Sequence, residues 1–310
     1  MTTHQPFTPP HPLNTAVLFL VFNRLATTKK VFEAIRQAKP PRLYIAADGA
    51  RETKEGEAEK VKAVRDYILK NIDWNCEVKT LFRDKNLGCK YAVSGGITWF
   101  FENEEQGIIL EDDCLPSQSF FWFCEHNLTV FKNDPKVLSV SGNLREMKNV
   151  SSENLIYKSI YFNMWGWATW RESWLNYDVD FFENNDFENV SFGLLSKKKS
   201  VFNYWKRMFY LTKLGGVDSW DYQFTFYSFS VEGEHIYPSI NMIHNIGFGP
   251  DATHTFSLIS PVINNKAEEF LLTDRIDNKK PLESIDYLLE KEYSTKSIFE
   301  RIANRFKRLL

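Results

Sequence analysis

Apolar and polar positions follow a repeating order along the first 113 residues. Short apolar runs, each the length of a buried strand, alternate with segments whose apolar residues recur at helical spacing. The expected strands cover 16–24, 41–50, 77–84 and 107–113, and the expected helices cover 27–39, 59–72 and 86–103. Strands that alternate with helices of this length indicate βαβ units and a mostly parallel sheet flanked by helices. The pattern therefore predicts an α/β fold.

The pattern is less regular after Pro116. The expected elements there are a helix with inward aromatic residues over 119–134, a strand over 137–144, a strand, loop and helix over 161–178, a helix over 217–233, and a strand running into a glycine-rich loop over 235–255. The chain shows no internal repeat, so we expect lobes of one domain. The expected division is a loose proline-rich arm over 1–14, a first lobe over 15–115, a second lobe over 116–260, and a charged tail over 261–310.

The amino-acid composition indicates which kinds of binding partner and which cell compartment to expect. The net charge of −2 gives the whole chain no attraction for nucleic acid. Aromatic residues make up 15% of the chain, which indicates thick aromatic packing, a surface that stacks on sugars or bases, or both. The four cysteines show neither C-x-x-C pairing nor zinc spacing, and no N-terminal export signal is evident. We therefore expect a cytoplasmic protein.

Polar and acidic residues gather where three of the expected strands end. These residues are Asn23, Arg24, Asp48, Glu111, Asp112 and Asp113. In parallel sheets, ligands bind at the carboxyl ends of the strands. Neighbouring carboxylates repel one another by roughly 1 to 4 kcal/mol per close pair, and a divalent cation such as Mg²⁺ or Mn²⁺ offsets that repulsion. A solvated acidic turn or a helix N-cap would also explain the acidic triplet, and both interpretations stay open here.

The segment "ILEDDCLPSQSFF" resembles the Glu-Asp-Asp signature of N-acetylglucosaminyltransferase I and related bacterial glycosyltransferases of the GT-A fold. The resemblance extends in order through "VFNR", "AADG", "NLG", "SWDYQF" and "NIGFGPDATHT", over about residues 15–256. It implies a Rossmann-like GT-A fold, with a nucleotide-sugar-binding lobe over 15–115 and an acceptor-binding lobe over 116–260. It also implies a metal-dependent, inverting transfer from a UDP-sugar to a hydroxyl of a glycan. Because no membrane anchor is evident in the sequence, we expect a role in cell-surface polysaccharide or glycoconjugate synthesis.

The resemblance also implies roles for the residues at the strand ends. Asp113 would ligate the Mn²⁺ or Mg²⁺ ion, Asp112 would meet the ribose or the water shell of the metal, and Glu111 would contact the transferred sugar. Asp48 would hydrogen-bond the base, and Arg24 would lie near the nucleotide. The other candidate donor-binding residues are Asn23, Lys85, Asn86 and His254. The sequence has no P-loop, so a metal rather than a glycine cradle must hold the phosphates.

An inverting transfer needs a base for the acceptor hydroxyl. The candidate is Asp221 in "VDSWDYQF", with Asp218 as the second choice. In the resembled family a further aspartate follows the Trp-Asp pair and acts as the base, but here that position is Tyr222. The spacing of Asp218 and Asp221 also fits a helix capping box, so the assignment stays open.

Four tryptophans lie in "MWGWATWRESW". Trp165 and Trp167 flank Gly166 and are candidates for a wall that stacks on a sugar of the acceptor. Trp167 also has helical spacing with Trp170 and Trp174, which is typical of core positions.

The segment "STKSIFERIANRFKRLL" combines an apolar stripe with a basic face, as a helix at an anionic membrane surface does. A helix packed on the domain fits the pattern equally well. If residues 296–310 contact the inner face of the membrane, the acceptor is expected to be a lipid-linked glycan.

Two other functions fit the same residues. A sugar-phosphate nucleotidyltransferase would share the nucleotide and the metal, although "VFNRLATTKK" lacks the glycine-rich loop expected after the first strand. A glycan-binding protein without catalytic activity would share the aromatic residues.

Overall fold

The computed structural model describes residues 7–144, 155–184, 198–247, 266–270, 283–291 and 293. The strands are β1 Val17–Val21, β2 Arg42–Ala47, β3 Glu77–Phe82, β4 Gln106–Glu111, β5 Cys114–Pro116, β6 Val137–Ser141, β7 Ile156–Ser159, β8 Trp167–Trp170, β9 Glu234–Pro238 and β10 Ile243–Asn245. The helices are α1 Leu25–Ala38, α2 Glu57–Asn71, α3 Gly88–Asn103, α4 Ser119–Val130, α5 Arg171–Trp174, α6 Phe181–Asn184, α7 Lys199–Lys213 and α8 Asp221–Ser230.

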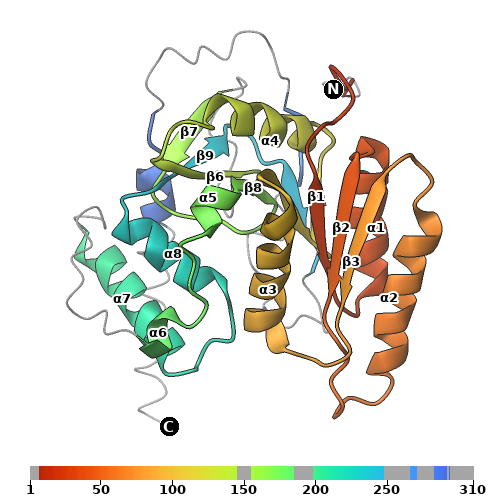
Figure 1. Ribbon diagram of the computed structural model, residues 1–310. Coiled ribbons are helices and arrows are strands. Elements are labelled where there is room, and N and C mark those ends of the chain that lie inside the picture. The colour runs from red at the N-terminus through yellow and green to blue at the C-terminus, as the bar shows by residue number, and fades with distance from the viewer. Residues whose placement is uncertain are drawn as a thin grey trace.

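One large sheet runs through the described part of the chain in the order β3-β2-β1-β4-β8-β6-β9-β7 (Figure 1). The pairs among β1, β2, β3 and β4 are parallel, as is the pair of β6 and β9. Strand β8 is antiparallel to both of its neighbours, and β7 is antiparallel to β9. The predicted class, an α/β fold with a mostly parallel sheet flanked by helices, is confirmed. Because β4 pairs with β8, the sheet continues from the first expected lobe into the second.

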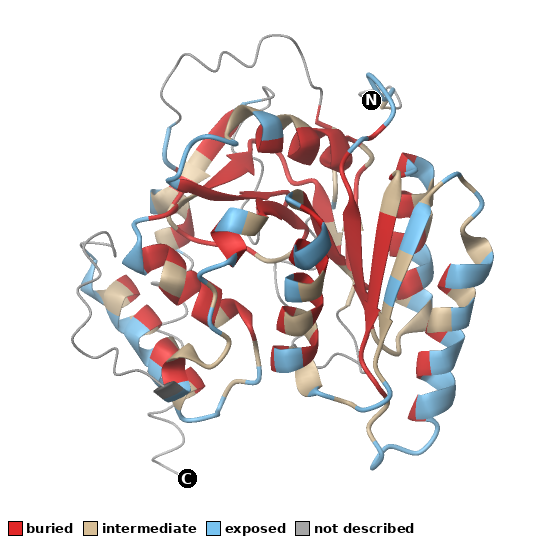
Figure 2. Cartoon of the chain, in the orientation of Figure 1, coloured by how far each residue is buried: buried red, intermediate tan, exposed pale blue. Residues whose placement is uncertain are grey.

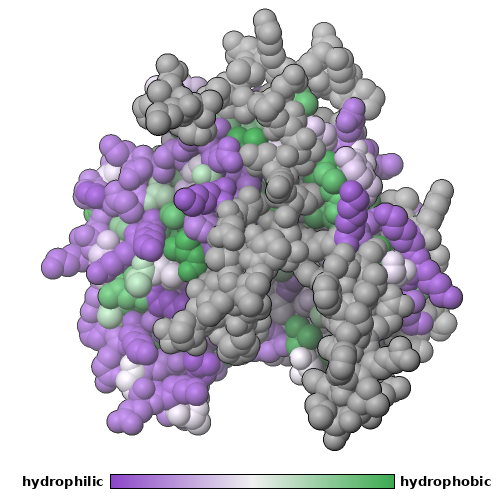
Figure 3. Space-filling view, turned by 180° about the vertical axis from the view of Figure 1, so that it is seen from behind, coloured by the Kyte–Doolittle hydropathy of each residue, from purple (hydrophilic) through white to green (hydrophobic). Residues whose placement is uncertain are grey.

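Helices cover both faces of the sheet because side chains alternate along each strand. Phe19 and Ile45 belong to the apolar cluster that contains α1, α2 and α4. Leu18 and Tyr44, one position away, belong to the cluster that contains α3 and Trp220. Figure 2 shows the result: the central strands are largely buried, and α1 and α2 bury one side while their other side is exposed. Seen from behind, the surface over α1 and α2 is largely hydrophilic (Figure 3).

The regular first part of the chain matches the expected elements, and the later part differs from them. The strand expected at the start of 161–178 is wrong, because the strand in that segment is β8, which follows the loop. Gly166 has a φ of +64° and turns the chain directly before β8. Helix α7 was not predicted, although its buried residues Val201, Trp205 and Phe209 lie on one helical stripe.

Residues 7–14 of the expected loose arm pack against α4. Leu13 is buried, and the ring of Phe7 lies 5.4 Å from that of Trp122. The indole Nε1 of Trp122 donates a hydrogen bond of 2.8 Å to the carbonyl oxygen of His11. This part of the arm is therefore held by contacts rather than loose.

In the part of the chain that the structure describes, every helix is too short or too polar to cross a bilayer. The predicted membrane contact over 296–310 lies outside the described residues.

Candidate functional site

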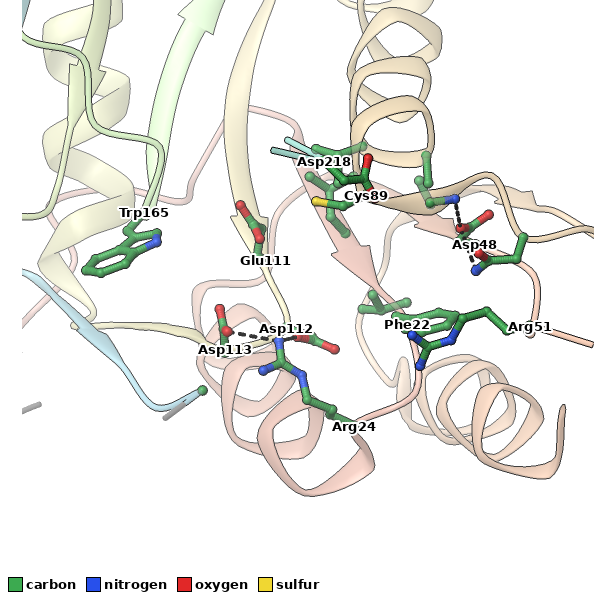
Figure 4. A pocket seen from close by; sticks show the side chains of 18 of the residues that line it. Phe22, Arg24, Asp48, Arg51, Cys89, Glu111, Asp112, Asp113, Trp165 and Asp218 are labelled. Atoms are coloured by element: carbon green, nitrogen blue, oxygen red, sulfur yellow. Dashed lines mark hydrogen bonds and ion pairs between the residues drawn. The ribbon is translucent and has the colours of Figure 1, made fainter. Parts of the chain in front are cut away.

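A cavity of about 330 Å³ opens at the carboxyl ends of β1, β2 and β4, beside the first turn of α3 (Figure 4). It is the edge at which the sequence predicts a ligand site. The predicted residues that line it are Arg24, Asp48, Asn86, Glu111, Asp112, Asp113, Trp165 and Asp218. Its charged side chains are five carboxylates and two guanidinium groups, those of Arg24 and Arg51. A nucleoside diphosphate would therefore enter a cavity that already carries excess negative charge.

The acidic triplet forms one wall of the cavity. Glu111 is the last residue of β4, and Asp112 and Asp113 form the turn into β5. The Nη2 group of Arg24 donates to Asp112 Oδ1 at 2.5 Å and to Asp113 Oδ2 at 2.8 Å. The second oxygen of Asp112, Oδ2, is buried and has no hydrogen-bond partner in the described part of the chain. The single guanidinium of Arg24 thus offsets only part of the negative charge of the three carboxylates.

The protonation of the triplet reflects this crowding. Burial, together with the charges of Asp113 and Asp112, raises the pKa of Glu111 to about 8. Burial raises the pKa of Asp112 to about 6, against the opposing effect of Arg24. Burial lowers the pKa of Arg24, but the two aspartates outweigh it and the pKa of this guanidinium is raised overall. A further cation at this wall would relieve the repulsion.

Backbone packing fixes the place of Asp113. The short antiparallel pair of β5 and β10 brings the end of β10 beside the triplet, and Ile246 N donates to Asp113 O at 2.8 Å. A Cβ atom on Gly247 would lie 2.1 Å from Asp113 Oδ2, so only glycine leaves room for the carboxylate. Position 247 therefore requires glycine because of the nearby Asp113 side chain, and not because of the backbone conformation.

Asp48 is tied to the turn before α3. It accepts hydrogen bonds from the backbone N–H groups of Gly49, Leu87 and Gly88 at 3.0 to 3.1 Å. It also accepts a bond of 2.9 Å from Asn86 Nδ2. Both oxygens of this carboxylate are thus used to hold the start of a helix, where a negative charge is favourable.

Of the two candidate bases, Asp218 lines the cavity and Asp221 does not. Asp218 accepts a hydrogen bond of 3.2 Å from Lys90 N in the first turn of α3. Asp221 is the first residue of α8, is buried, and accepts a bond from Ser219 Oγ. The capping box that the spacing of the two aspartates allowed is not formed, because Asp218 binds α3 instead of α8.

The two candidate tryptophans of the sugar wall separate. Trp165 lines the cavity, with its ring at the end where Glu111 and Asp113 lie (Figure 4). Trp167 is buried at 1% exposure, and its ring stacks on that of Trp220 at 5.7 Å. The prediction of Trp167 as part of the wall is therefore wrong, and its alternative placement in the core is confirmed.

Two further predicted donor-binding residues, Asn23 and Lys85, do not line the cavity. Asn23 Nδ2 donates to Glu57 Oε1 at 2.9 Å, and Lys85 is exposed on the turn before α3. His254 lies outside the described residues.

Phe22, Arg51 and Cys89 are among the lining residues that were not predicted from the sequence. Phe22 directly precedes the predicted Asn23, and Arg51 lies three residues after the predicted Asp48, so their places after the ends of β1 and β2 could have identified them. Cys89 has no local sequence signal. Burial, and then the negative charge of Glu111, raise the pKa of its thiol.

The donor set at the triplet fits a hard divalent cation. Mg²⁺ and related ions are often held by one or two carboxylates together with substrate phosphates. The unpartnered Asp112 Oδ2 and the Asp113 carboxylate are oxygens of this kind. Among the residues that the structure describes, no group of three or more His, Cys, Asp and Glu side chains could enclose a metal alone. Phosphate oxygens would have to complete the coordination.

No protein-family model and no curated protein matches the sequence. Solved structures with similar folds include HddC from Yersinia pseudotuberculosis, with 11% identity, a TM-score of 0.33, and coverage of 57% of this chain and 87% of that one. The glycosyltransferase GlyE of Streptococcus pneumoniae has 12% identity and a TM-score of 0.33, and the match covers 74% of this chain and 55% of GlyE. A UDP-glucose pyrophosphorylase has 8% identity and a TM-score of 0.32, and the match covers 74% of this chain and 93% of the pyrophosphorylase.

Proposed function

We propose that this protein is a metal-dependent glycosyltransferase of the GT-A fold that moves a sugar from a nucleotide-diphosphate donor, a UDP-sugar, to a hydroxyl of a glycan. The observation that carries the proposal is the acidic triplet. Three adjacent carboxylates face one cavity at the end of a core strand, and one buried oxygen among them has no partner.

The residues of the cavity divide the work of such a transfer. Asp113 and Asp112 would hold Mn²⁺ or Mg²⁺, which when bound stabilises negative charge on the departing diphosphate. Glu111 would meet the transferred sugar, and Trp165 would stack on the acceptor beside it. Asp218 lies in the same cavity and is the better placed of the two candidate bases to deprotonate the acceptor hydroxyl. Direct attack on the donor would invert the anomeric centre.

The cellular setting belongs to the same proposal. Synthesis of a cell-surface polysaccharide or glycoconjugate at the inner face of the membrane would bring a lipid-linked glycan to the acceptor side. Residues 296–310 would supply the membrane contact through their basic and apolar faces.

A nucleotidyltransferase is less well supported. Its nucleophile is a sugar phosphate, whose negative charge adds to that of a nucleoside triphosphate and calls for several cationic side chains. The cavity offers five carboxylates, two arginines and no lysine among its described lining residues.

The proposal is tested by incubating the protein with UDP-, GDP- and CMP-sugars, in Mn²⁺ and in EDTA, and following the released nucleotide. We expect slow, metal-dependent release of a nucleoside diphosphate, through hydrolysis when no acceptor is supplied. Asp113→Asn should abolish it, and Asp66→Asn, an exposed carboxylate on α2, should not. Release of pyrophosphate from a nucleoside triphosphate and a sugar phosphate would instead identify a nucleotidyltransferase.

A further inference from the structure

Helix α7 carries all of its charged side chains on one face, and all of them are cations. Its sequence, KSVFNYWKRMFYLTK, contains no aspartate or glutamate. Successive residues of an α-helix are about 100° apart around its axis, so the four cations fall within a sector of about 120°. The residues of this sector, here called the basic face, are Lys199, Asn203, Lys206, Arg207, Tyr210, Lys213 and the C-cap residue Leu214. The buried residues Val201, Trp205 and Phe209 lie on the opposite side.

The basic face is open to solvent. Lys199, Lys206 and Arg207 are exposed. Two large apolar side chains lie among these cations, with 48% of Tyr210 and 64% of Leu214 exposed. Exposed apolar side chains are stabilised when a partner removes them from water. A partner that fits this face should therefore be anionic and should also accept apolar groups.

Two carboxylates on neighbouring elements bind lysines outside the basic face. Helix α6 packs on α7 through Phe182, whose ring stacks on that of Phe209. The next residue of α6, Glu183, binds Lys90 of α3. Glu290 binds Lys198, which directly precedes α7, with 3.0 Å between Oε2 and Nζ. These carboxylates are thus engaged away from Lys199 and Lys206.

The basic face ends close to the cavity along the chain. Leu214 lies four residues before Asp218, which lines the cavity. Four residues span at most about 14 Å. Gly215, with a φ of +70°, turns the chain between them. A surface bound to the end of α7 would therefore lie near the proposed acceptor side of the cavity.

We propose that the basic face of α7 docks on an anionic phospholipid surface, with Lys199 and Lys206 at the headgroups and with Tyr210 and Leu214 entering the interface. A bilayer combines the negative charge and the apolar interior that this face fits. A soluble polyanion would match the charge but would leave the two apolar side chains in water. The helix would lie along the surface, because its opposite side is buried in the protein. This contact is separate from the one proposed for residues 296–310, and it does not depend on transferase activity.

Sedimentation with lipid vesicles tests the proposal. The full chain is mixed with neutral phosphatidylcholine vesicles, or with vesicles that also contain phosphatidylglycerol. We expect binding to the anionic vesicles to be stronger by about 10-fold or more. The double variant Lys199→Glu, Lys206→Glu should lose about 10-fold or more of that affinity, because each lysine near an anionic surface contributes about fivefold.

The matched control is the double variant Lys60→Glu, Lys70→Glu, which makes the same change of charge at exposed positions of α2. Helices α2 and α7 lie on opposite sides of the molecule (Figure 1). The control should bind anionic vesicles within about threefold of the unmodified protein, because salt screens charges that lie far from the surface. Leu214→Ser should weaken binding by about threefold or more, because less apolar surface then leaves water.

Equal binding to the two kinds of vesicle, or equal losses in the α7 and α2 double variants, would overturn the proposal. If Leu214→Ser keeps full binding while inorganic polyphosphate displaces the vesicles, the partner is a soluble polyanion and the proposal is wrong. UDP binding in Mn²⁺, measured on the same variants, should not change, since the basic face does not line the cavity. Absence of UDP binding in the unmodified protein would overturn the proposed function, and vesicle binding would still decide the role of α7.

Discussion

The two ends of the cavity treat a buried carboxylate in opposite ways. Asp48 is surrounded by donors, and every oxygen position it offers is used to hold the turn before α3. At the triplet, two of the three carboxylates bind the Arg24 guanidinium, and a buried oxygen of Asp112 has no hydrogen-bond partner among the described residues. The first arrangement is complete in the protein alone, and we propose that a cation completes the second. Substitutions should therefore cost stability at one end and activity at the other.

The largest effect is expected at Asp113. Asp113→Asn keeps the shape of the side chain beside Gly247 but removes the charge that would bind the metal. Because a metal supplies several kcal/mol of stabilisation to the transition state, transfer should fall by about 10³-fold or more. Steady-state rates in saturating Mn²⁺ measure this. An active Asp113→Asn with unchanged metal dependence would place the metal elsewhere.

The two candidate bases give the next largest effect. Asp218→Asn can still accept the hydrogen bond from Lys90 N, so its fold should persist while transfer falls by about 10²-fold to 10⁴-fold. Donor binding should change little. Asp221→Asn is the matched comparison, and we expect it to retain transfer because Asp221 does not line the cavity. The opposite pattern in kcat would make Asp221 the base.

At the end of the cavity where Asp48 binds the turn before α3, Asp48→Ala should destabilise the fold. It leaves the N–H groups of Leu87 and Gly88 without their acceptor, and the free energy of unfolding should fall by about 2 to 4 kcal/mol. Urea unfolding measures the loss. In Asp113→Ala, at the end of the cavity that holds the triplet, the free energy of unfolding should fall by much less or should rise. Equal losses in the two variants would remove the difference between the two ends.

The smallest effect concerns pH. The pKa of Glu111 in the fold is about 8, above its ordinary value of 4.5, so the folded chain binds this proton more tightly than the unfolded chain. The metal-free protein should therefore lose stability, on the order of 2 kcal/mol, as the pH rises from about 5 to about 8.

Glu111→Gln should flatten that loss, because the amide does not ionise. Glu102→Gln, an exposed position on α3, should follow the unmodified protein. Thermal melts in EDTA across this range provide the comparison. A profile of Glu111→Gln identical to that of the unmodified protein would show that Glu111 ionises normally.

The fold of the first lobe could be predicted because β1, β2 and β4 are apolar runs, and because the helices between the strands have apolar residues at helical spacing. The topology rule then placed Arg24, Asp48 and the triplet at one edge. The path of the chain at Trp167 could not be predicted, since a single positive φ at Gly166 decides it. The partners of Asp48 and Asp218 were also hidden. Their bonds to the α3 turn span about 40 and 128 residues of sequence, and no local pattern reports such contacts.

The most direct test is calorimetric titration of UDP into the unmodified protein, in Mn²⁺ and in EDTA. The incomplete carboxylate wall predicts measurable binding in Mn²⁺ that weakens by about 10-fold or more in EDTA, and an Asp113→Asn variant in which the metal makes no difference. Equal affinity in Mn²⁺ and EDTA, or no binding of UDP in any divalent metal, would contradict it.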